Sequence, residues 1–109
     1  MEKIYNKLVR DNIPEIIKSN GGEPIYRKLN DDEYWKYLLL KDKEELQEVE
    51  EAENLEERKK ELADKLEVLK AMAEFSGFSL SEIMEEASEK RDERGGFDKR
   101  VFLEKVIEE

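Results

Sequence analysis

Cysteine and histidine are both absent from the 109 residues of this chain. Without cysteine, disulfide bonds, thiol nucleophiles and thiolate metal sites are excluded. Without histidine, the chain has no imidazole base and no Ser-His-Asp triad. Any general base must therefore be a carboxylate, with lysine or tyrosine as the alternatives.

Apolar runs long enough to cross a membrane, about 18 residues or more, are also missing, and no signal-peptide pattern is present. We therefore expect a cytoplasmic protein. Basic residues are in deficit, with 20 against 30 acids and a formal net charge of −10. Nucleic acid and anionic membranes need a dense basic face, so neither is expected as a partner. A small phosphorylated ligand is compatible with this charge, because a few basic residues can gather locally.

The length predicts one domain, residues 1–109, whose modest core is marginal on its own. Two capping patterns, N-D-D-E from Asn30 and N-x-x-E from Asn54, predict long helices over about residues 31–51 and 55–75. We expect these helices to form an antiparallel helix hairpin in a mainly α fold. Because a two-helix hairpin cannot close a core, we expect a four-helix-bundle core completed by oligomerisation, in a homodimer or homotetramer.

Shorter elements precede the hairpin. Residues 3–9 form an extended or irregular lead-in. A helix of about two turns is expected from the N-cap Asp11 to Ser19. Residues 24–29 include a short β-like run before the first long helix.

The chain after the hairpin is expected to add one helix and one strand. Gly77 is the expected C′ residue of the second long helix. Ser79 or Ser81 caps a further helix that ends near Arg91. After a glycine loop, we expect residues 99–107 to form a short extended segment, a strand.

Acidic residues interrupt the apolar faces of both long helices. At ~100° per residue, Glu45 falls inside the apolar sector of the first helix and Glu48 flanks it on the same side. Glu61 and Asp64 fall inside the apolar arc of the second helix. Burying an unpaired carboxylate costs several kcal/mol or forces it to take up a proton, so these positions indicate a bound counter-charge. Asp42 also falls inside the first sector, where we expect it to support a ligand or face a substrate.

The four carboxylates are expected to meet at one height of the hairpin. Measured from Asn54 at ~1.5 Å per residue, Glu48 and Glu61 lie about 9 and 10 Å away, and Glu45 and Asp64 both about 14 Å. Carboxylate oxygens favour hard ions, so we predict that these four residues bind Mg²⁺, with Mn²⁺ as the alternative. In a chain that is 46% charged, such acids also occur on solvated helix faces, and that interpretation stays open.

Two groups of basic residues could bind phosphate. One is N-terminal and consists of Lys7 and Arg10. The other surrounds the glycine pair at residues 95–96 and comprises Lys90, Arg91, Arg94, Lys99 and Arg100. Glycines beside arginine let backbone N–H groups and guanidinium groups approach phosphate oxygens. The same basic run at a helix end also compensates the negative helix terminus.

Taken together, the motifs resemble a known family. The order E-E-x-x-E (Glu44, Glu45, Glu48), a gap of 12 residues and then E-x-x-D (Glu61, Asp64) is similar to the MazG-like, all-α nucleoside triphosphate pyrophosphohydrolase superfamily. YNKLVRDNIPEII at residues 5–17 and KRDERGGF at residues 90–97 resemble its phosphoribosyl-ATP pyrophosphohydrolase-like branch.

The resemblance implies Mg²⁺-dependent hydrolysis of a nucleoside triphosphate to a monophosphate and pyrophosphate. It assigns the metal ligands to the same four carboxylates. It gives Glu44 a position that holds a water or supports the metal ligands, and it makes Lys41 a phosphate contact. The tyrosine-histidine pair that follows E-x-x-D in phosphoribosyl-ATP pyrophosphohydrolases is absent. Leu66-Glu67-Val68-Leu69 stands in this region instead. This difference favours a house-cleaning role or an uncharacterised nucleotide specificity over a role in histidine biosynthesis.

Our mechanistic hypothesis is that a water activated by Mg²⁺ attacks the α-phosphorus after Glu44 or Glu48 takes its proton. Basic residues between 90 and 100 stabilise the leaving pyrophosphate. Hydrolysis of dUTP or phosphoribosyl-ATP would use the same metal site with a different base pocket. A non-catalytic helical oligomerisation module is the alternative from another class of protein.

Overall fold

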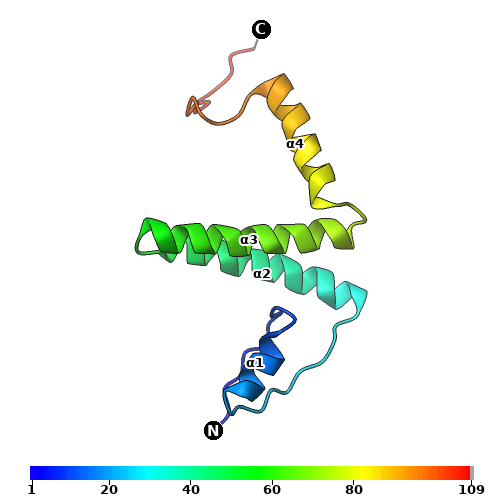
Figure 1. The fold of residues 1–109 in the computed structure, drawn as a ribbon. Coiled ribbons are helices and arrows are strands. Elements are labelled where there is room, and N and C mark those ends of the chain that lie inside the picture. The colour runs from blue at the N-terminus through cyan, green and yellow to red at the C-terminus, as the bar shows by residue number, and fades with distance from the viewer. Residues whose placement is uncertain (109) are drawn as a thin grey trace.

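The computed structural model describes residues 1–108, which form four α-helices and no strand. Helix α1 spans Ile13–Ser19, α2 spans Asp31–Glu51, α3 spans Leu55–Phe75 and α4 spans Leu80–Arg94. Helices α2 and α3 lie side by side and run in opposite directions, whereas α4 leads away from the end of α3 (Figure 1). The expected α-helical fold class is confirmed. Over residues 1–108, no helix combines the length and the apolar character needed to cross a membrane.

Side-chain caps begin the three longer helices where the sequence predicts them. Asn30 Oδ1 accepts a hydrogen bond from the backbone N–H of Glu33 at 2.9 Å, at the start of α2. Asn54 Oδ1 accepts one from the N–H of Glu57 at 2.8 Å, at the start of α3. Ser79 caps α4 in the same way. Each cap satisfies a backbone donor that has no partner inside its helix, so these helix starts are determined locally.

Helix α3 ends at Phe75, and Gly77 is its C′ residue, as predicted, in a Schellman motif. The N–H of Phe78 donates to the carbonyl of Ala73 at 2.9 Å, and the N–H of Gly77 donates to the carbonyl of Glu74 at 3.1 Å. Gly77 has a φ of 91°, in the left-handed region where a residue with a β-carbon is strained.

Gly77→Ala is expected to lower the free energy of unfolding by about 1 kcal/mol, because alanine disfavours the left-handed backbone at this position. No heavy atom lies within 4 Å of the place where the new β-carbon would stand, so the cost comes from the backbone alone. Gly77→Asn is expected to lose less stability, since asparagine tolerates this conformation. Urea unfolding of the three proteins measures the effect, and identical midpoints for wild type and Gly77→Ala would contradict it.

The ends of the shorter helices differ from the expectations. Helix α1 is preceded by Asn12 and not by Asp11, and the Asn12 side chain makes no capping hydrogen bond. Helix α4 continues past the expected end at Arg91 to Arg94 and stops at Gly95, whose φ is 82°. Glycine ends the helix because it adopts this backbone conformation without strain.

The strand expected over residues 99–107 is wrong, and the β-like run at 24–29 also has no regular structure. Val101 and Phe102 are 84% and 86% exposed. A strand forms only where a neighbouring strand takes up its backbone hydrogen bonds, and residues 1–108 offer no such neighbour. Apolar, β-branched composition therefore predicted a strand that has no partner strand among residues 1–108.

The single chain buries few apolar side chains. Its buried hydrophobic core consists of Leu38, Val68 and Ala73. Leu39 and Leu46, which belong to the predicted apolar stripe of α2, are 39% and 47% exposed. The radius of gyration is 18.6 Å, whereas a compact chain of this length has about 13 Å. The helices therefore leave apolar surface that one chain does not cover.

Candidate metal centre

Two carboxylates from α2 and two from α3 come together between these helices. Glu45 and Glu48 are three residues apart on α2, and Glu61 and Asp64 are three residues apart on α3, so each pair lies on one face of its helix. One oxygen from each of the four side chains lies within 4.8 Å of the others. The four residues singled out from the sequence are thus adjacent in the structure.

Two of these residues each have one carboxylate oxygen that is buried. Glu45 is 5% exposed, and its Oε2 is buried without a hydrogen-bond partner in the structure. Glu61 Oε2 is buried in the same way. Two carboxylate charges at this separation repel by about 3 kcal/mol in partly buried surroundings. An arrangement of this kind needs protons or cations to offset the repulsion and the lost hydration.

The pKa values of Glu45 and Glu48, the two cluster residues on α2, are raised. Burial, followed by the neighbouring Glu48 carboxylate, raises the pKa of Glu45 above its ordinary value. Burial, followed by contact with Glu61, raises the pKa of Glu48. In the absence of a metal ion, both groups therefore hold protons more tightly than an exposed glutamate does.

Three cations lie at the edge of the cluster. Lys41 Nζ is 3.5 Å from Glu45 Oε1 and 3.4 Å from Glu44 Oε2. Arg10 Nη2 donates to Asp64 Oδ1 at 2.8 Å. Lys7 donates to Glu44 Oε1 at 2.8 Å. Together with Glu44, the cluster has five carboxylates against these three cations, so two negative charges are left unmatched, which is the charge of one divalent ion.

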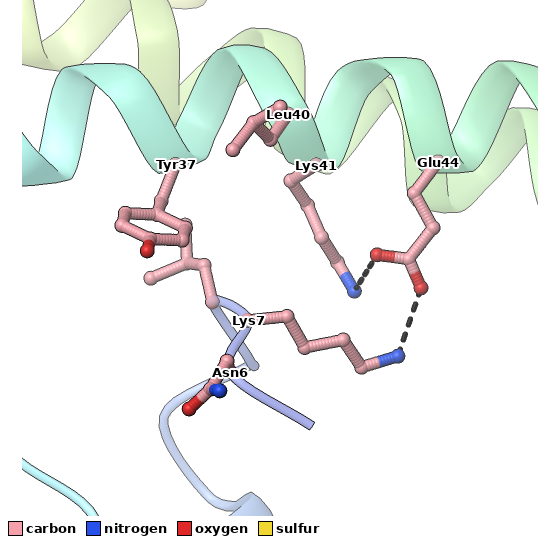
Figure 2. A pocket seen from close by; sticks show the side chains of 7 residues that line it. Asn6, Lys7, Tyr37, Leu40, Lys41 and Glu44 are labelled. Carbon is pink, nitrogen blue, oxygen red and sulfur yellow. Dashed lines mark hydrogen bonds and ion pairs between the residues drawn. The ribbon is translucent and has the colours of Figure 1, made fainter. Parts of the chain in front are cut away.

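Glu44 is not one of the four clustered carboxylates, and it pairs with Lys7 and Lys41. Figure 2 shows both lysine side chains directed at its carboxylate, beside a small cavity whose other walls include Tyr37 and Leu40. The hydrogen bond from Lys7 is the main cause that lowers the pKa of Glu44. Both Glu44 oxygens accept a hydrogen bond from a lysine, so this carboxylate is held ionised and in a defined position.

Asp42, which was expected to support a ligand or face a substrate, pairs with the neighbouring helix. Lys65 Nζ of α3 donates to Asp42 Oδ1 at 2.6 Å. This ion pair joins α2 to α3. Both side chains are partly exposed, Asp42 at 35% and Lys65 at 33%. Asp42 therefore contributes a contact between the helices and is not part of the carboxylate cluster.

The second basic group lies on α4 and the segment that follows it, away from the cluster. Helix α4 contacts α3 and leads away from the α2–α3 pair (Figure 1). Arg91 pairs with Asp98 at 3.2 Å. No ion pair of residues 1–108 joins a member of this group to the cluster; the members are Lys90, Arg91, Arg94, Lys99 and Arg100. Within one chain, the cations at the carboxylates are Lys7, Arg10 and Lys41.

Sequence reasoning identified Lys7 and Arg10 as a basic pair but did not connect them with the acids. Their partners are 37 and 54 residues away along the chain. Neither helical periodicity nor capping carries information about such distant pairs. The signal in the sequence was the presence of two cations in a short segment of an acidic chain, without any indication of which helix they would meet.

The donor set fits a hard divalent ion. All four candidate ligands are carboxylates, which Mg²⁺ and Mn²⁺ accept and which zinc sites rarely use alone. An octahedral Mg²⁺ has oxygens at about 2.1 Å, so its ligand atoms lie at most about 4.2 Å apart. The observed limit of 4.8 Å needs only a small contraction. The unpartnered Oε2 atoms of Glu45 and Glu61 are available for such an ion.

Comparison with known proteins adds one short match. No family model matches the chain, and no solved structure gives a significant match. An uncharacterised protein of Mycolicibacterium smegmatis (strain ATCC 700084 / mc(2)155) is 52% identical over 40 residues. The matched segment is 37% of this chain and 41% of that protein, so the chain spans less than half of this relative. This relative is itself uncharacterised, so the match indicates no function.

Proposed function

We propose that this protein is a Mg²⁺-dependent nucleotide pyrophosphohydrolase that converts a nucleoside triphosphate to a monophosphate and pyrophosphate, in a house-cleaning role. The observation that carries the proposal is the cluster of Glu45, Glu48, Glu61 and Asp64, with their oxygens within 4.8 Å of one another. The motif resemblance supplies the reaction class. The buried, unpartnered oxygen of Glu45 separates this cluster from an ordinary solvated acidic face.

In this proposal the four carboxylates hold the metal, and the residues around them position the substrate. When bound, Mg²⁺ would neutralise phosphate charge and increase the acidity of a water. Glu48 makes no ion pair among residues 1–108, which favours it over Glu44 as acceptor of the water's proton. Glu44 accepts hydrogen bonds from Lys7 and Lys41 and so keeps both cations beside the cluster. Lys41 remains the candidate phosphate contact on α2.

A panel of canonical, deoxy and modified nucleoside triphosphates tests the proposal. With Mg²⁺ present, we expect at least one of them, including dUTP and phosphoribosyl-ATP, to be cleaved with release of pyrophosphate. Chelation of the metal should stop the reaction. If the panel is inert and calorimetry detects no stoichiometric binding of Mg²⁺ or Mn²⁺, the helices serve as a non-catalytic oligomerisation module.

The proposed enzyme works as a homo-oligomer in which a second copy completes a four-helix bundle with the α2–α3 hairpin. The accessible surface of the chain is 10,311 Å², against roughly 6,300 Å² for a compact protein of this mass. A groove on α3 is lined by Leu62, Leu66, Leu69 and Met72, with Asp42 and Lys65 of the inter-helix ion pair at its edge. Leu62 and Leu66 are each 51% exposed. A second copy of the same helices is a suitable partner, because it brings an equal apolar face to be covered.

Leu66→Glu is expected to shift the protein from oligomer to monomer, because it places a charge in the centre of this apolar groove. Light scattering coupled to size exclusion at several concentrations measures the mass. Lys60→Gln, on the exposed side of α3, is the control, since it makes the same change in net charge. A wild type that is already monomeric at high concentration would contradict the oligomer proposal and would leave the metal site as proposed.

A further inference from the structure

The segment before α1 reaches both helices of the metal centre. Its backbone turns at Asn6, which has a φ of 46°, a conformation that asparagine adopts more readily than most residues. Lys7 then contacts Glu44 of α2, and Arg10 contacts Asp64 of α3, each at 2.8 Å. One short segment thus supplies a cation to each of the two helices that form the cluster.

In both of these ion pairs, the cation can leave its carboxylate and pair with another anion. The Arg10 and Asp64 side chains are 57% and 42% exposed, and the contact uses one guanidinium nitrogen and one carboxylate oxygen. The Lys7 side chain is 39% exposed. Solvent-exposed, singly bonded pairs contribute little to stability. Lys41, by contrast, is 17% exposed beside Glu45 and is held in place.

We infer that Lys7 and Arg10 are exchangeable cations of the site, which pair with the carboxylates in the ion-free protein and bind the substrate's polyphosphate when a divalent ion occupies the cluster. The inference rests on the proposed function. An ion bound by Asp64 competes with Arg10 for the same carboxylate, so ion binding releases the guanidinium group beside the ion. The polyphosphate of a metal–nucleotide complex must lie there, and a guanidinium group can grip two of its oxygens at once.

The geometry favours this N-terminal pair over the basic group on α4 as the phosphate contact within one chain. Lys7 already contacts Glu44, and Arg10 already contacts Asp64, which is a candidate metal ligand. Lys7 and Arg10 pair with carboxylates in this structure, and the same cations can pair with the phosphates of a substrate instead. The N-terminal segment therefore links ion binding to substrate binding.

The test compares two binding measurements on the 109-residue chain. We expect Arg10→Gln to bind Mg²⁺ about two- to fivefold more tightly than wild type, because a competing cation has been removed. The same variant is expected to bind inorganic tripolyphosphate, at saturating Mg²⁺, about tenfold more weakly, because a charge-assisted contact has been lost. Lys7→Gln should weaken tripolyphosphate binding in the same direction. Isothermal titration calorimetry measures the dissociation constants of Mg²⁺ and of tripolyphosphate. Because tripolyphosphate has no nucleobase, the result does not depend on which nucleotide the protein prefers.

Opposite changes in the two affinities distinguish exchange from a structural role. Lys18→Gln on α1, whose ion pair is with Glu15, is the control and should change neither constant. Arg10→Lys should bind tripolyphosphate more tightly than Arg10→Gln but more weakly than wild type, because lysine keeps the charge and lacks the paired N–H donors of a guanidinium group. If Arg10→Gln weakens both ligands, or changes neither, while wild type binds Mg²⁺ and releases pyrophosphate, this inference alone is overturned. A wild type that binds no divalent ion overturns it together with the proposed function.

Discussion

Asp64→Asn is expected to abolish Mg²⁺-dependent release of pyrophosphate, with a loss of more than about a hundredfold, while the helix content stays unchanged. The substitution keeps the shape of the side chain and removes its charge from the cluster, where Asp64 is the second carboxylate from α3. Its side chain is 42% exposed, so the change places no new group in the core. Pyrophosphate release with the nucleotide selected by the panel, and circular dichroism, are the two measurements.

Asp42→Asn is the matched control for this variant. It makes the same chemical change on α2, but Asp42 pairs with Lys65 and lies outside the cluster. The control should lose only an exposed ion pair, worth less than about 1 kcal/mol of stability, and should retain its activity. Full activity in Asp64→Asn would refute the assignment of this residue as a metal ligand, and equal losses in both variants would point to a general structural effect.

Glu45→Gln is expected to change stability in opposite ways with and without the metal. In a chelating buffer, we expect the free energy of unfolding to rise by about 1–2 kcal/mol, because a buried charge and its repulsion with three neighbouring carboxylates are removed. Lys41 keeps a partner in this variant, since it also pairs with Glu44. A raised pKa for Glu45 is consistent with the same cause, because the folded environment already disfavours the charged form.

With excess Mg²⁺, wild type is expected to gain stability and Glu45→Gln to gain much less. An ion at a concentration a hundred times its dissociation constant stabilises the folded state by about 2.7 kcal/mol. Chemical unfolding of both proteins in chelator and in Mg²⁺ yields the four values that are needed. Glu67→Gln, on the exposed side of α3, should respond to Mg²⁺ as wild type does. A less stable Glu45→Gln in chelator, with an undiminished Mg²⁺ response, would contradict a metal site at Glu45.

Local chemistry explains why much of the fold could be predicted. The starts of α2, α3 and α4 depend on Asn30, Asn54 and Ser79, each of which bonds a backbone N–H three residues away. The end of α3 depends on Gly77 and its neighbours. These interactions span only one turn of chain, so a reading of consecutive residues is sufficient to find them.

Prediction failed where the outcome depended on distant parts of the chain. The run at 99–107 has a composition suited to a strand but has no neighbouring strand among the residues that the structure describes. Asp42 lies in the apolar sector because Lys65 reaches it from α3. The phosphate-binding role expected of the basic group on α4 stays a prediction; within one chain, that helix leads away from α2 and α3 (Figure 1).

The order of residues along two neighbouring helices was sufficient to bring Glu45, Glu48, Glu61 and Asp64 to a common height, because helical rise is constant and a short turn makes the two helices run back along each other. Which cations meet these acids could not be read from the order, since Lys7 and Arg10 are 37 and 54 residues from their partners. The path of the N-terminal segment across α2 and α3 decides those contacts. Short-range geometry therefore accounts for the four carboxylates and for Lys41, which pairs with acids of its own helix. Long-range packing brings Lys7 and Arg10 to the site.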